Sequence, residues 1–195
     1  MQQPTLLVIN GHPNGHLSLC GALANAYLEG AREAGHQANA LILSELDFAQ
    51  SFKGYGAHTP VEPDLRKAQD SVRAATHLVF VYPNWWGAMP ALLKAFIDRA
   101  FLPGFAFSYR AKDSLLWNKL LPGKTARLIV TMDTPPWYYR WIYKAPGDRL
   151  MRQNILGFCG IKPVKSTHFG PVKLSTPAQR DTWIEHCRRL GRQGI

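Results

Sequence analysis

The chain has 195 residues and a formal net charge of +10, with 46% hydrophobic and 11% aromatic residues. This length and apolar content predict one folded domain over residues 1–195 and exclude a disordered chain. No apolar run approaches the roughly 20 residues that span a bilayer, so we expect no membrane insertion. Three scattered cysteines without a CxxC pair exclude a disulfide scaffold or a zinc ribbon, and we expect a cytoplasmic protein with reduced thiols.

The positive charge is spread along the chain. Only Arg188, Arg189 and Arg192 cluster, near the C-terminus. This spread favours a basic solvated surface over a nucleic-acid-binding face, so no nucleic-acid partner is expected. Attraction of anionic small molecules such as nucleotide phosphates is a third explanation, and composition alone does not choose among the three.

The first half of the chain alternates between strand and helix patterns. Short continuous apolar runs are typical of strands buried on both faces of a sheet, and apolar residues three and four apart are typical of helices. In chain order the patterns predict a strand at Thr5–Asn10, a helix from Ser18 to about Ala34, a strand at Asn39–Leu43, a helix from Asp64 to about Ala75 and a strand at His77–Tyr82.

The second half continues the alternation after a helix that starts at Pro90. Residues 102–123 fit neither pattern and predict a loop region rich in aromatic residues. The remaining patterns predict a helix at Pro90–Ala100, a strand at Ala126–Thr131, a helix at Asp148–Phe158, a strand at Lys162–His168 and a helix at Pro177–Leu190. These elements predict an α/β fold with a five-stranded parallel sheet and helices on both faces. Ligands then bind beyond the carboxyl ends of the strands, in the loops 11–18, 83–90 and 131–147.

The first of these loops, GHPNGHLS, leads directly into a predicted helix. Free backbone N–H groups and the positive end of the helix dipole suit a phosphate there, with Ser18 and His12 as further donors. An ordinary turn with a serine cap explains the loop equally well. His12 and His16 lack a third ligand nearby, so no metal site is predicted. For Cys20 a buried thiol is favoured over a reactive thiolate.

Two enzyme signatures are excluded. The tetrapeptide Pro122–Thr125 contains Gly-Lys-Thr, but it lacks the upstream glycine of a phosphate loop and precedes a strand rather than a helix. The G-x-S-x-G motif of serine hydrolases does not occur. Neither an NTPase nor a hydrolase of that class is therefore expected.

The loop at 83–90, PNWWGAMP, gives the strongest functional signal. Two adjacent tryptophans follow a central strand and are bracketed by prolines. Such a loop predicts a surface that stacks on a flat aromatic ligand while backbone N–H groups read the heteroatoms of its ring. The alternative is that Trp85 and Trp86 fill a seam between helix and sheet.

Several segments resemble the NAD(P)H:quinone oxidoreductase family. They are Gly11-His12-Pro13 with Ser18, the block Tyr82–Lys94, and Phe101 with Gly104-Phe105-Ala106-Phe107. Gly157–Gly160 and the last helix also resemble that family, so the resemblance covers nearly the whole chain. It implies a flavodoxin-like three-layer fold with strand order 2-1-3-4-5, bound FMN (alternatively FAD), and NAD(P)H as the reductant of a quinone-like acceptor.

The resemblance also implies which residues contact the flavin. They are His12, Ser18, Leu19 and Cys20 at the phosphate; Pro83, Asn84, Trp85 and Trp86 at the isoalloxazine; and Thr131, Met132, Asp133 and Thr134 at its pyrimidine edge. Family members place a tyrosine and a histidine in the loop after the fourth strand. Tyr139 is the expected catalytic tyrosine, with Tyr138 as the alternative register. No histidine lies between His77 and His168, so the histidine partner is missing, and residues 132–136 replace the family's Thr-Gly-Gly turn.

Other functions and the assembly follow from the same segments. Reduction of azo or nitro compounds is one alternative, and a regulatory subunit resembling the flavodoxin-like partners of potassium efflux systems is another. An electron-carrier flavodoxin is disfavoured because those proteins are typically acidic. The aromatic-rich segments Phe101–Tyr109 and Trp137–Tyr143 predict a homodimer with these segments near the interface. The choice between NADH and NADPH stays open.

Overall fold

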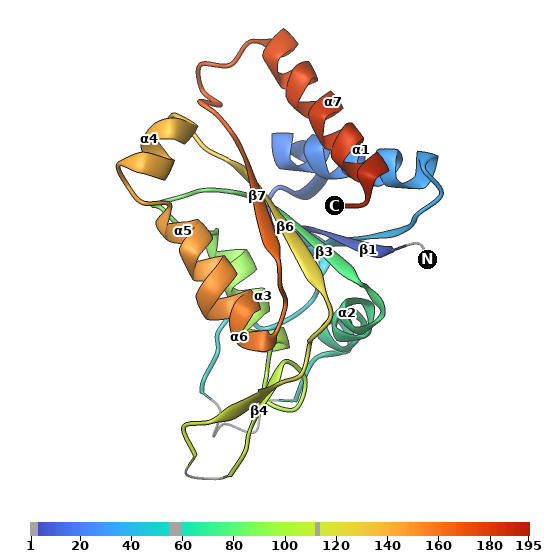
Figure 1. Ribbon diagram of the computed structural model, residues 1–195, viewed down its shortest axis with the longest axis vertical. Coiled ribbons are helices and arrows are strands. Elements are labelled where there is room, and N and C mark those ends of the chain that lie inside the picture. Colours follow the sequence, from blue (N-terminus) through green and yellow to red (C-terminus); the bar gives the residue numbers. More distant parts are fainter. Residues whose placement is uncertain (1–3, 55–59, 112–113) are drawn as a thin grey trace.

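The computed structural model describes residues 4–54, 60–111 and 114–195, and its centre is a five-stranded parallel sheet (Figure 1). The strands follow the order β2-β1-β3-β6-β7. Their bounds are β1 Thr5–Asn10, β2 Gln37–Ile42, β3 His77–Pro83, β6 Thr125–Thr131 and β7 Val164–Phe169. The predicted order 2-1-3-4-5 is confirmed, because β6 and β7 are the fourth and fifth strands of this sheet.

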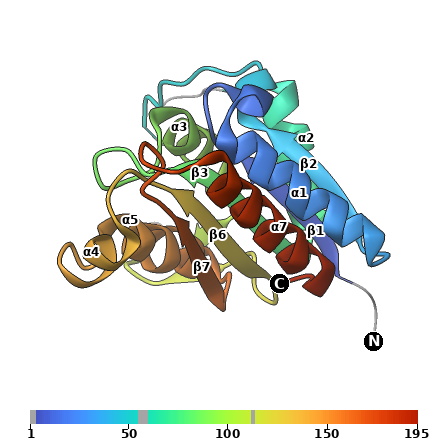
Figure 2. The same cartoon turned by 90° about the horizontal axis from the view of Figure 1, so that it is seen from above.

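Helices cover both faces of the sheet and leave three layers (Figure 2). On one face α1 packs beside α7, and on the other lie α2, α3 and the consecutive turns α5, η3 and α6. The bounds are α1 Leu19–Glu33, α2 Pro63–Ala74, α3 Ala91–Ala100, α5 Pro146–Arg149, η3 Leu150–Leu156, α6 Gly157–Cys159 and α7 Pro177–Gln193.

The sheet is buried on both faces, as its apolar runs predict. In β1, Leu6 and Val8 join the cluster under α1 and α7, while Leu7 and Ile9 join the cluster under α2 and α3. Successive side chains of a strand point to opposite faces, so a continuous apolar run supplies two cores at once. All seven residues of β3 are buried.

The helices α1 and α7 approach each other closely. A Cβ on Gly30 would collide with the carbonyl of Arg188, so only glycine permits this distance. Arg188 pairs with Glu29 at 2.8 Å, and Arg192 pairs with Glu33 at 2.8 Å. Two of the three arginines that cluster near the C-terminus are therefore engaged within the fold and do not form a free basic patch.

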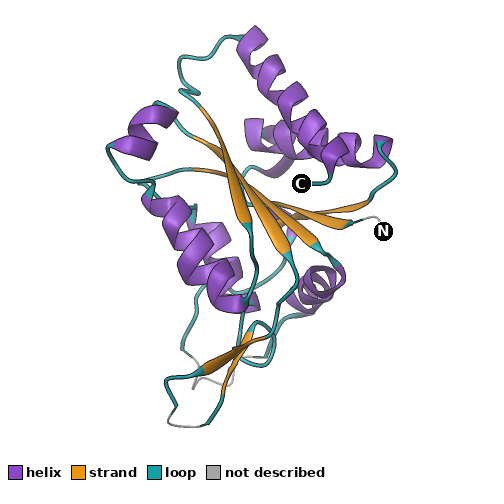
Figure 3. Cartoon of the chain, in the orientation of Figure 1, coloured by secondary structure: helices purple, strands orange, loops and turns teal. Residues whose placement is uncertain are grey.

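The prediction of a loop at 102–123 is wrong in part. The strands β4 Phe107–Tyr109 and β5 Trp117–Lys119 pair antiparallel and form a hairpin apart from the main sheet (Figure 3). Trp117 anchors the hairpin, since its ring stacks on Phe158 at 4.5 Å and its Nε1 donates to the Phe158 carbonyl at 3.0 Å. Two strands of three residues are too short to show an alternating pattern in the sequence.

Four further elements differ from the sequence prediction. The helix predicted at 148–158 is a π-helix over η3, flanked by the short turns α5 and α6. The loop predicted at 131–147 contains α4 Pro136–Trp141, and short 3-10 turns occur at η1 Gly15–Leu17 and η2 Leu43–Glu45. Within the described residues, no helix combines the length and the apolar character that crossing a bilayer requires.

Candidate active site

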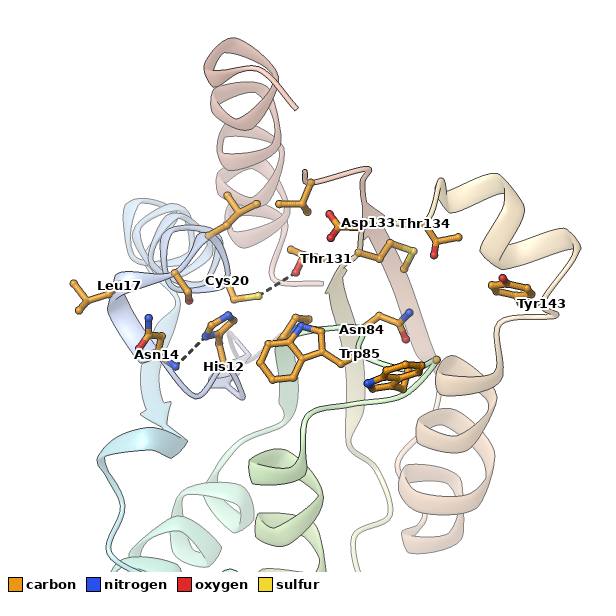
Figure 4. Close-up of a pocket in the computed structure, with 17 residues that line it drawn as sticks. His12, Asn14, Leu17, Cys20, Asn84, Trp85, Thr131, Asp133, Thr134 and Tyr143 are labelled. Carbon is orange, nitrogen blue, oxygen red and sulfur yellow. Dashed lines mark hydrogen bonds between the residues drawn. The ribbon is translucent and has the colours of Figure 1, made fainter. Parts of the chain in front are cut away.

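A cavity of about 700 Å³ lies at the carboxyl ends of β1, β3 and β6 (Figure 4). Ligand sites of doubly wound folds occur at this edge and have volumes of roughly 300–1,000 Å³. The cavity brings together all twelve residues that the resemblance assigns to the flavin: His12, Ser18, Leu19, Cys20, Pro83, Asn84, Trp85, Trp86, Thr131, Met132, Asp133 and Thr134. Its lining also includes Asn14, Leu17, Gly87 and Tyr143, which lie within the three predicted ligand loops, and Val172, which lies outside them.

The start of α1 forms one end of the cavity. Ser18 caps the helix: its hydroxyl accepts from the Gly21 N–H at 3.0 Å and donates to the Gly15 carbonyl at 2.7 Å. A Cβ on Gly21 would come within 2.6 Å of that carbonyl, so the loop packs directly on the helix. The first N–H groups of a helix have no partner within it, and those of Leu19 and Cys20 remain available to an anion.

His12 adds a second donor at this end. Its Nδ1 accepts from the Asn14 N–H at 3.0 Å, which leaves the proton of the neutral ring on Nε2. Partial burial lowers the pKa of His12, so the ring is neutral at pH 7. The ring also meets Trp85 edge-on, with 5.7 Å between the centroids. His12 is therefore a positioned, uncharged N–H donor.

Trp85 and Trp86 form the opposite wall on a tight turn. Trp85 and Ala88 exchange backbone hydrogen bonds of 2.9 and 3.0 Å, and between them Trp86 and Gly87 have φ angles of 54° and 80°. A bulky residue rarely adopts a positive φ, because its Cβ meets the backbone. Trp86 is fully exposed and Trp85 is half exposed, so the alternative that both fill a helix–sheet seam is wrong.

The three loops are linked to one another. The Asn84 N–H donates to the Thr131 carbonyl at 2.7 Å, which joins the second loop to the third. The Cys20 thiol lies 3.3 Å from the Thr131 hydroxyl, which joins the third loop to α1. Burial raises the pKa of Cys20 to about 12, so this thiol is neutral and structural. These links form the cavity in advance of any ligand.

Tyr139, the predicted catalytic residue, lies outside the cavity lining. Its ring is 1% exposed, and its hydroxyl accepts from the Gly147 N–H at 3.0 Å and the Asp148 N–H at 3.3 Å. Burial and the nearby Asp148 raise the pKa of Tyr139 to about 12. The tyrosine that lines the cavity is Tyr143. A catalytic role for Tyr139 stays a prediction, while its position assigns it to holding the start of α5.

A histidine does lie beside Tyr139, although it comes from another element. The His168 ring, on β7, is 5.6 Å from the Tyr139 ring, and its Nε2 lies 3.0 Å from Asp148 Oδ1. His168 therefore lies outside the loop after the fourth strand, where the resemblance places the histidine partner. The position of His168 at the end of the fifth predicted strand was the available signal, because parallel strands end at one edge of the sheet.

The described residues contain no group of three or more His, Cys, Asp or Glu side chains that could hold a metal ion. His16, four residues after His12, lies 3.6 Å from Glu45 instead. The lining of the main cavity offers backbone N–H groups, hydroxyls, amides and aromatic rings, and its groups that could bind a metal are His12, Cys20 and Asp133, which are not clustered around one point. This lining suits a phosphate and a flat ring rather than a metal.

Comparison with known proteins agrees with this geometry. The family of the flavodoxin-like fold matches residues 4–191. An uncharacterized NAD(P)H oxidoreductase of Haemophilus influenzae is 28% identical over 92% of this chain and 90% of its own length. An FMN-dependent NADH:quinone oxidoreductase of Macrococcus caseolyticus is 28% identical over 82% and 83%.

A solved structure shares the whole fold. The NAD(P)H:quinone oxidoreductase from Methanothermobacter marburgensis superposes with a TM-score of 0.84 over 100% of both chains, at 22% sequence identity. The sheet order, the three-loop cavity and the sequence matches point to one assignment. The chain belongs to the family of the flavodoxin-like fold, and the relatives that it matches over most of its length include an NAD(P)H oxidoreductase and an FMN-dependent NADH:quinone oxidoreductase.

Proposed function

We propose that this protein is an enzyme that oxidises NAD(P)H and reduces quinones through bound FMN. The observation that carries the proposal is the cavity of about 700 Å³ at the carboxyl edge of the sheet, with a helix N-terminus at one end and exposed aromatic rings at the other. The relatives named above, an NAD(P)H oxidoreductase and an FMN-dependent NADH:quinone oxidoreductase, support it.

The residues present fit a flavin mononucleotide. The capped start of α1 offers N–H groups and a hydroxyl to a phosphate, and the volume of about 700 Å³ admits a three-ring system. When bound, the flavin supplies the hydride chemistry that no side chain can perform. Ser18, Leu19 and Cys20 would hold its phosphate, and Asn84 and Thr131 would line its ring.

The protein's own contribution is to position the rings and exclude water. Trp85, Trp86 and Tyr143 border the cavity with flat apolar surfaces, against which a nicotinamide and then a quinone can lie. His12 offers a neutral N–H at the phosphate end. Because the three loops are already cross-linked by hydrogen bonds, little ordering cost falls on binding.

The test has two parts on one preparation. The purified protein is denatured, and the absorbance and mass of the released flavin distinguish FMN from FAD. The intact protein is then mixed with NADPH and menadione, and we expect rapid oxidation of NADPH. Release of FMN with negligible oxidation would instead favour the regulatory subunit of an ion-efflux system, and release of no flavin would contradict the proposal.

We also propose a symmetric homodimer. An apolar groove of about 320 Å³ lies between α3 and η3, lined by Ile97, Leu150 and Ile155 among others, and Trp137 and Trp141 are each more than half exposed. Exposed apolar surfaces of this kind mark interfaces. The segment Phe101–Tyr109 contributes less than its sequence indicates, since its three phenylalanines are buried and Tyr109 is its one exposed aromatic residue. Sedimentation at micromolar concentration should give twice 21.9 kDa.

We place the protein in the cytoplasm. Cys20, Cys159 and Cys187 are all free and buried, and free thiols are the rule in a reducing compartment. Cell fractionation followed by immunoblotting checks this. Recovery of the protein mainly outside the cytoplasmic fraction would contradict it.

A further inference from the structure

A further cavity, of about 570 Å³, lies against β7, one of the two edge strands of the five-stranded sheet. We call it the basic groove after the four exposed cationic side chains that line it: Arg140, Arg149, Arg152 and Lys162. None of these four forms an ion pair with any residue that the structure describes, whereas the arginines of α7 that face α1 are paired with glutamates.

The only acidic side chain in the groove lining is already balanced. Asp148 lies 3.0 Å from His168 Nε2. Burial alone would raise the pKa of Asp148, but the hydrogen bond from His168 and the nearby charge of Arg152 outweigh it and lower that pKa. The imidazole therefore faces a carboxylate that is ionised at neutral pH. Four unpaired cations against one hydrogen-bonded carboxylate give the groove a strong positive potential, which its walls concentrate.

The basic groove adjoins the cavity of the proposed active site. The segment 140–145 separates them: Tyr143 lines the active-site cavity, while Arg140 and Ala145 line the groove. Tyr143 is three positions after Arg140 in the chain, so their Cα atoms are at most about 11 Å apart. A ligand with a ring beside Tyr143 can thus extend its polar part to Arg140 and into the groove.

We propose that the basic groove binds the phosphate groups of the reductant and that contact of the 2′-phosphate of NADPH with its arginines makes the enzyme prefer NADPH over NADH. This inference rests on the proposed function, because it takes NAD(P)H to be the reductant. Arginine is suited to the role, since its guanidinium binds phosphate oxygens in pairs and stays charged at every physiological pH. Arg149 and Arg152, on adjacent turns of one helical segment, are the pair that we assign to the 2′-phosphate.

The first experiment compares two double variants that remove the same charge. Arg149→Gln/Arg152→Gln changes the groove, while Arg66→Gln/Arg189→Gln changes exposed positions on α2 and α7. Loss of charged hydrogen bonds to phosphate should lower the ratio of kcat/KM for NADPH to that for NADH by about tenfold in the groove variant. The control variant should keep the wild-type ratio. Equal ratios in all three proteins would overturn the inference.

The second experiment measures binding without turnover. Isothermal titration calorimetry of the flavin-loaded protein uses adenosine 2′,5′-bisphosphate and, as the matched ligand, adenosine 5′-monophosphate. We expect the bisphosphate to bind wild type about tenfold more tightly than the monophosphate, and the groove variant to lose that difference. Equal affinities for the two ligands in wild type would overturn the assignment of the groove.

The two proposals fail in different ways. A protein that releases FMN and oxidises NADH and NADPH with equal kcat/KM retains the proposed function and overturns the groove assignment. A protein that releases no flavin and oxidises neither nucleotide overturns the proposed function, and the groove assignment with it.

Discussion

The amino and carboxyl edges of the central sheet use their polar side chains in different ways. Near the amino edge, His77 Nδ1 lies 2.6 Å from the Thr125 hydroxyl, and Arg127 donates to the Thr167 hydroxyl and to the Ile195 carbonyl, each at 2.7 Å. His77 and Arg127 are both buried. The hydrogen bonds of His77 Nδ1 and Arg127 are made within the protein, where they fix strands and the C-terminus together, and the second ring nitrogen of His77, Nε2, is buried without a partner among the described residues.

At the carboxyl edge the loops keep donors and rings available to a ligand. Ser18 caps α1 and leaves the next N–H groups at the cavity, and Trp86 is fully exposed on a backbone with positive φ. A protein that only needed to be stable would satisfy those groups internally and relax that turn. We infer from this contrast that the amino edge is built for stability and the carboxyl edge for binding. Four experimental changes test this inference.

The largest effect should follow from a charge placed at the start of α1. Aspartate caps a helix as well as serine does, so Ser18→Asp should fold normally. Its carboxylate would face the flavin phosphate, and like charges 4 Å apart repel by about 4 kcal/mol at the effective dielectric of a protein surface. We expect flavin affinity to fall by at least about 100-fold, measured as flavin content after dialysis and as Kd by fluorescence titration.

Asparagine at the same position is the matched control. Ser18→Asn keeps a good cap without the charge and should retain most of the flavin. If the Ser18→Asp protein purifies with its full content of flavin, the flavin phosphate does not lie at this end of the cavity.

The second change tests the amino edge by pH. Burial, with the charges of Arg127 and Lys165, lowers the pKa of His77 from 6.5 to about 4. The unfolded chain then binds a proton in a range where the folded protein does not, so stability is full above pH 6.5 and falls as the pH decreases toward 4. Between pH 7.5 and pH 5 the free energy of unfolding should drop by about 2 kcal/mol from His77 alone.

Urea unfolding of wild type and His77→Gln at both pH values isolates this contribution. Glutamine can still bond to Thr125 but does not titrate, so the variant should lose about 2 kcal/mol less than wild type over the same interval. Equal losses in the two proteins would show that His77 is not held neutral by its burial.

The sequence predicts the sheet better than it predicts the contacts between loops. A buried strand such as β3 needs an uninterrupted apolar run, and such runs are visible in one dimension. The π-helix η3 presents an apolar face much as an α-helix would, so the pattern at 148–158 could not distinguish them. The hairpin β4–β5 is too short for a period to emerge.

The candidate site shows the same difference between what a sequence pattern predicts and what depends on packing. All twelve expected flavin contacts lie in the loops that follow parallel strands or on the strand and helix ends beside those loops, and topology alone brings these segments together. The direction in which a side chain points within an irregular loop depends on packing, so Tyr138, Tyr139 and Tyr143 could not be told apart. The contact between His168 and Tyr139 was not predicted, because it joins residues that are distant in the chain.

The third change tests whether Tyr139 serves stability, as the polar residues of the amino edge do, or takes part in the reaction at the carboxyl edge. Tyr139→Phe removes the acceptor of the Gly147 and Asp148 N–H groups, and buried donors left unpaired cost about 1–3 kcal/mol. We expect a loss of that size in urea unfolding, with Tyr138→Phe as a control that loses little. The catalytic prediction requires, in addition, that flavin reduction slow by about 100-fold while flavin content stays constant. Stopped-flow rates equal to wild type in both variants would leave Tyr139 a structural residue.

The smallest effect on stability, and the sharpest separation of stability from binding, should come from Trp86. Glycine adopts a positive φ freely, so Trp86→Gly relieves a strain of about 1 kcal/mol, and the greater freedom of glycine in the unfolded chain offsets a similar amount. The side chain is fully exposed, so no packing is lost, and the free energy of unfolding should stay within about 1 kcal/mol of wild type. Loss of a stacking surface should nevertheless raise KM for menadione by up to about tenfold.

Trp85→Ala is the comparison: that ring is half buried and meets His12, so both stability and binding should fall. If Trp86→Gly instead loses more than about 2 kcal/mol of stability, the Trp86 ring packs within the fold in solution, and the carboxyl edge is not the open surface that the contrast requires.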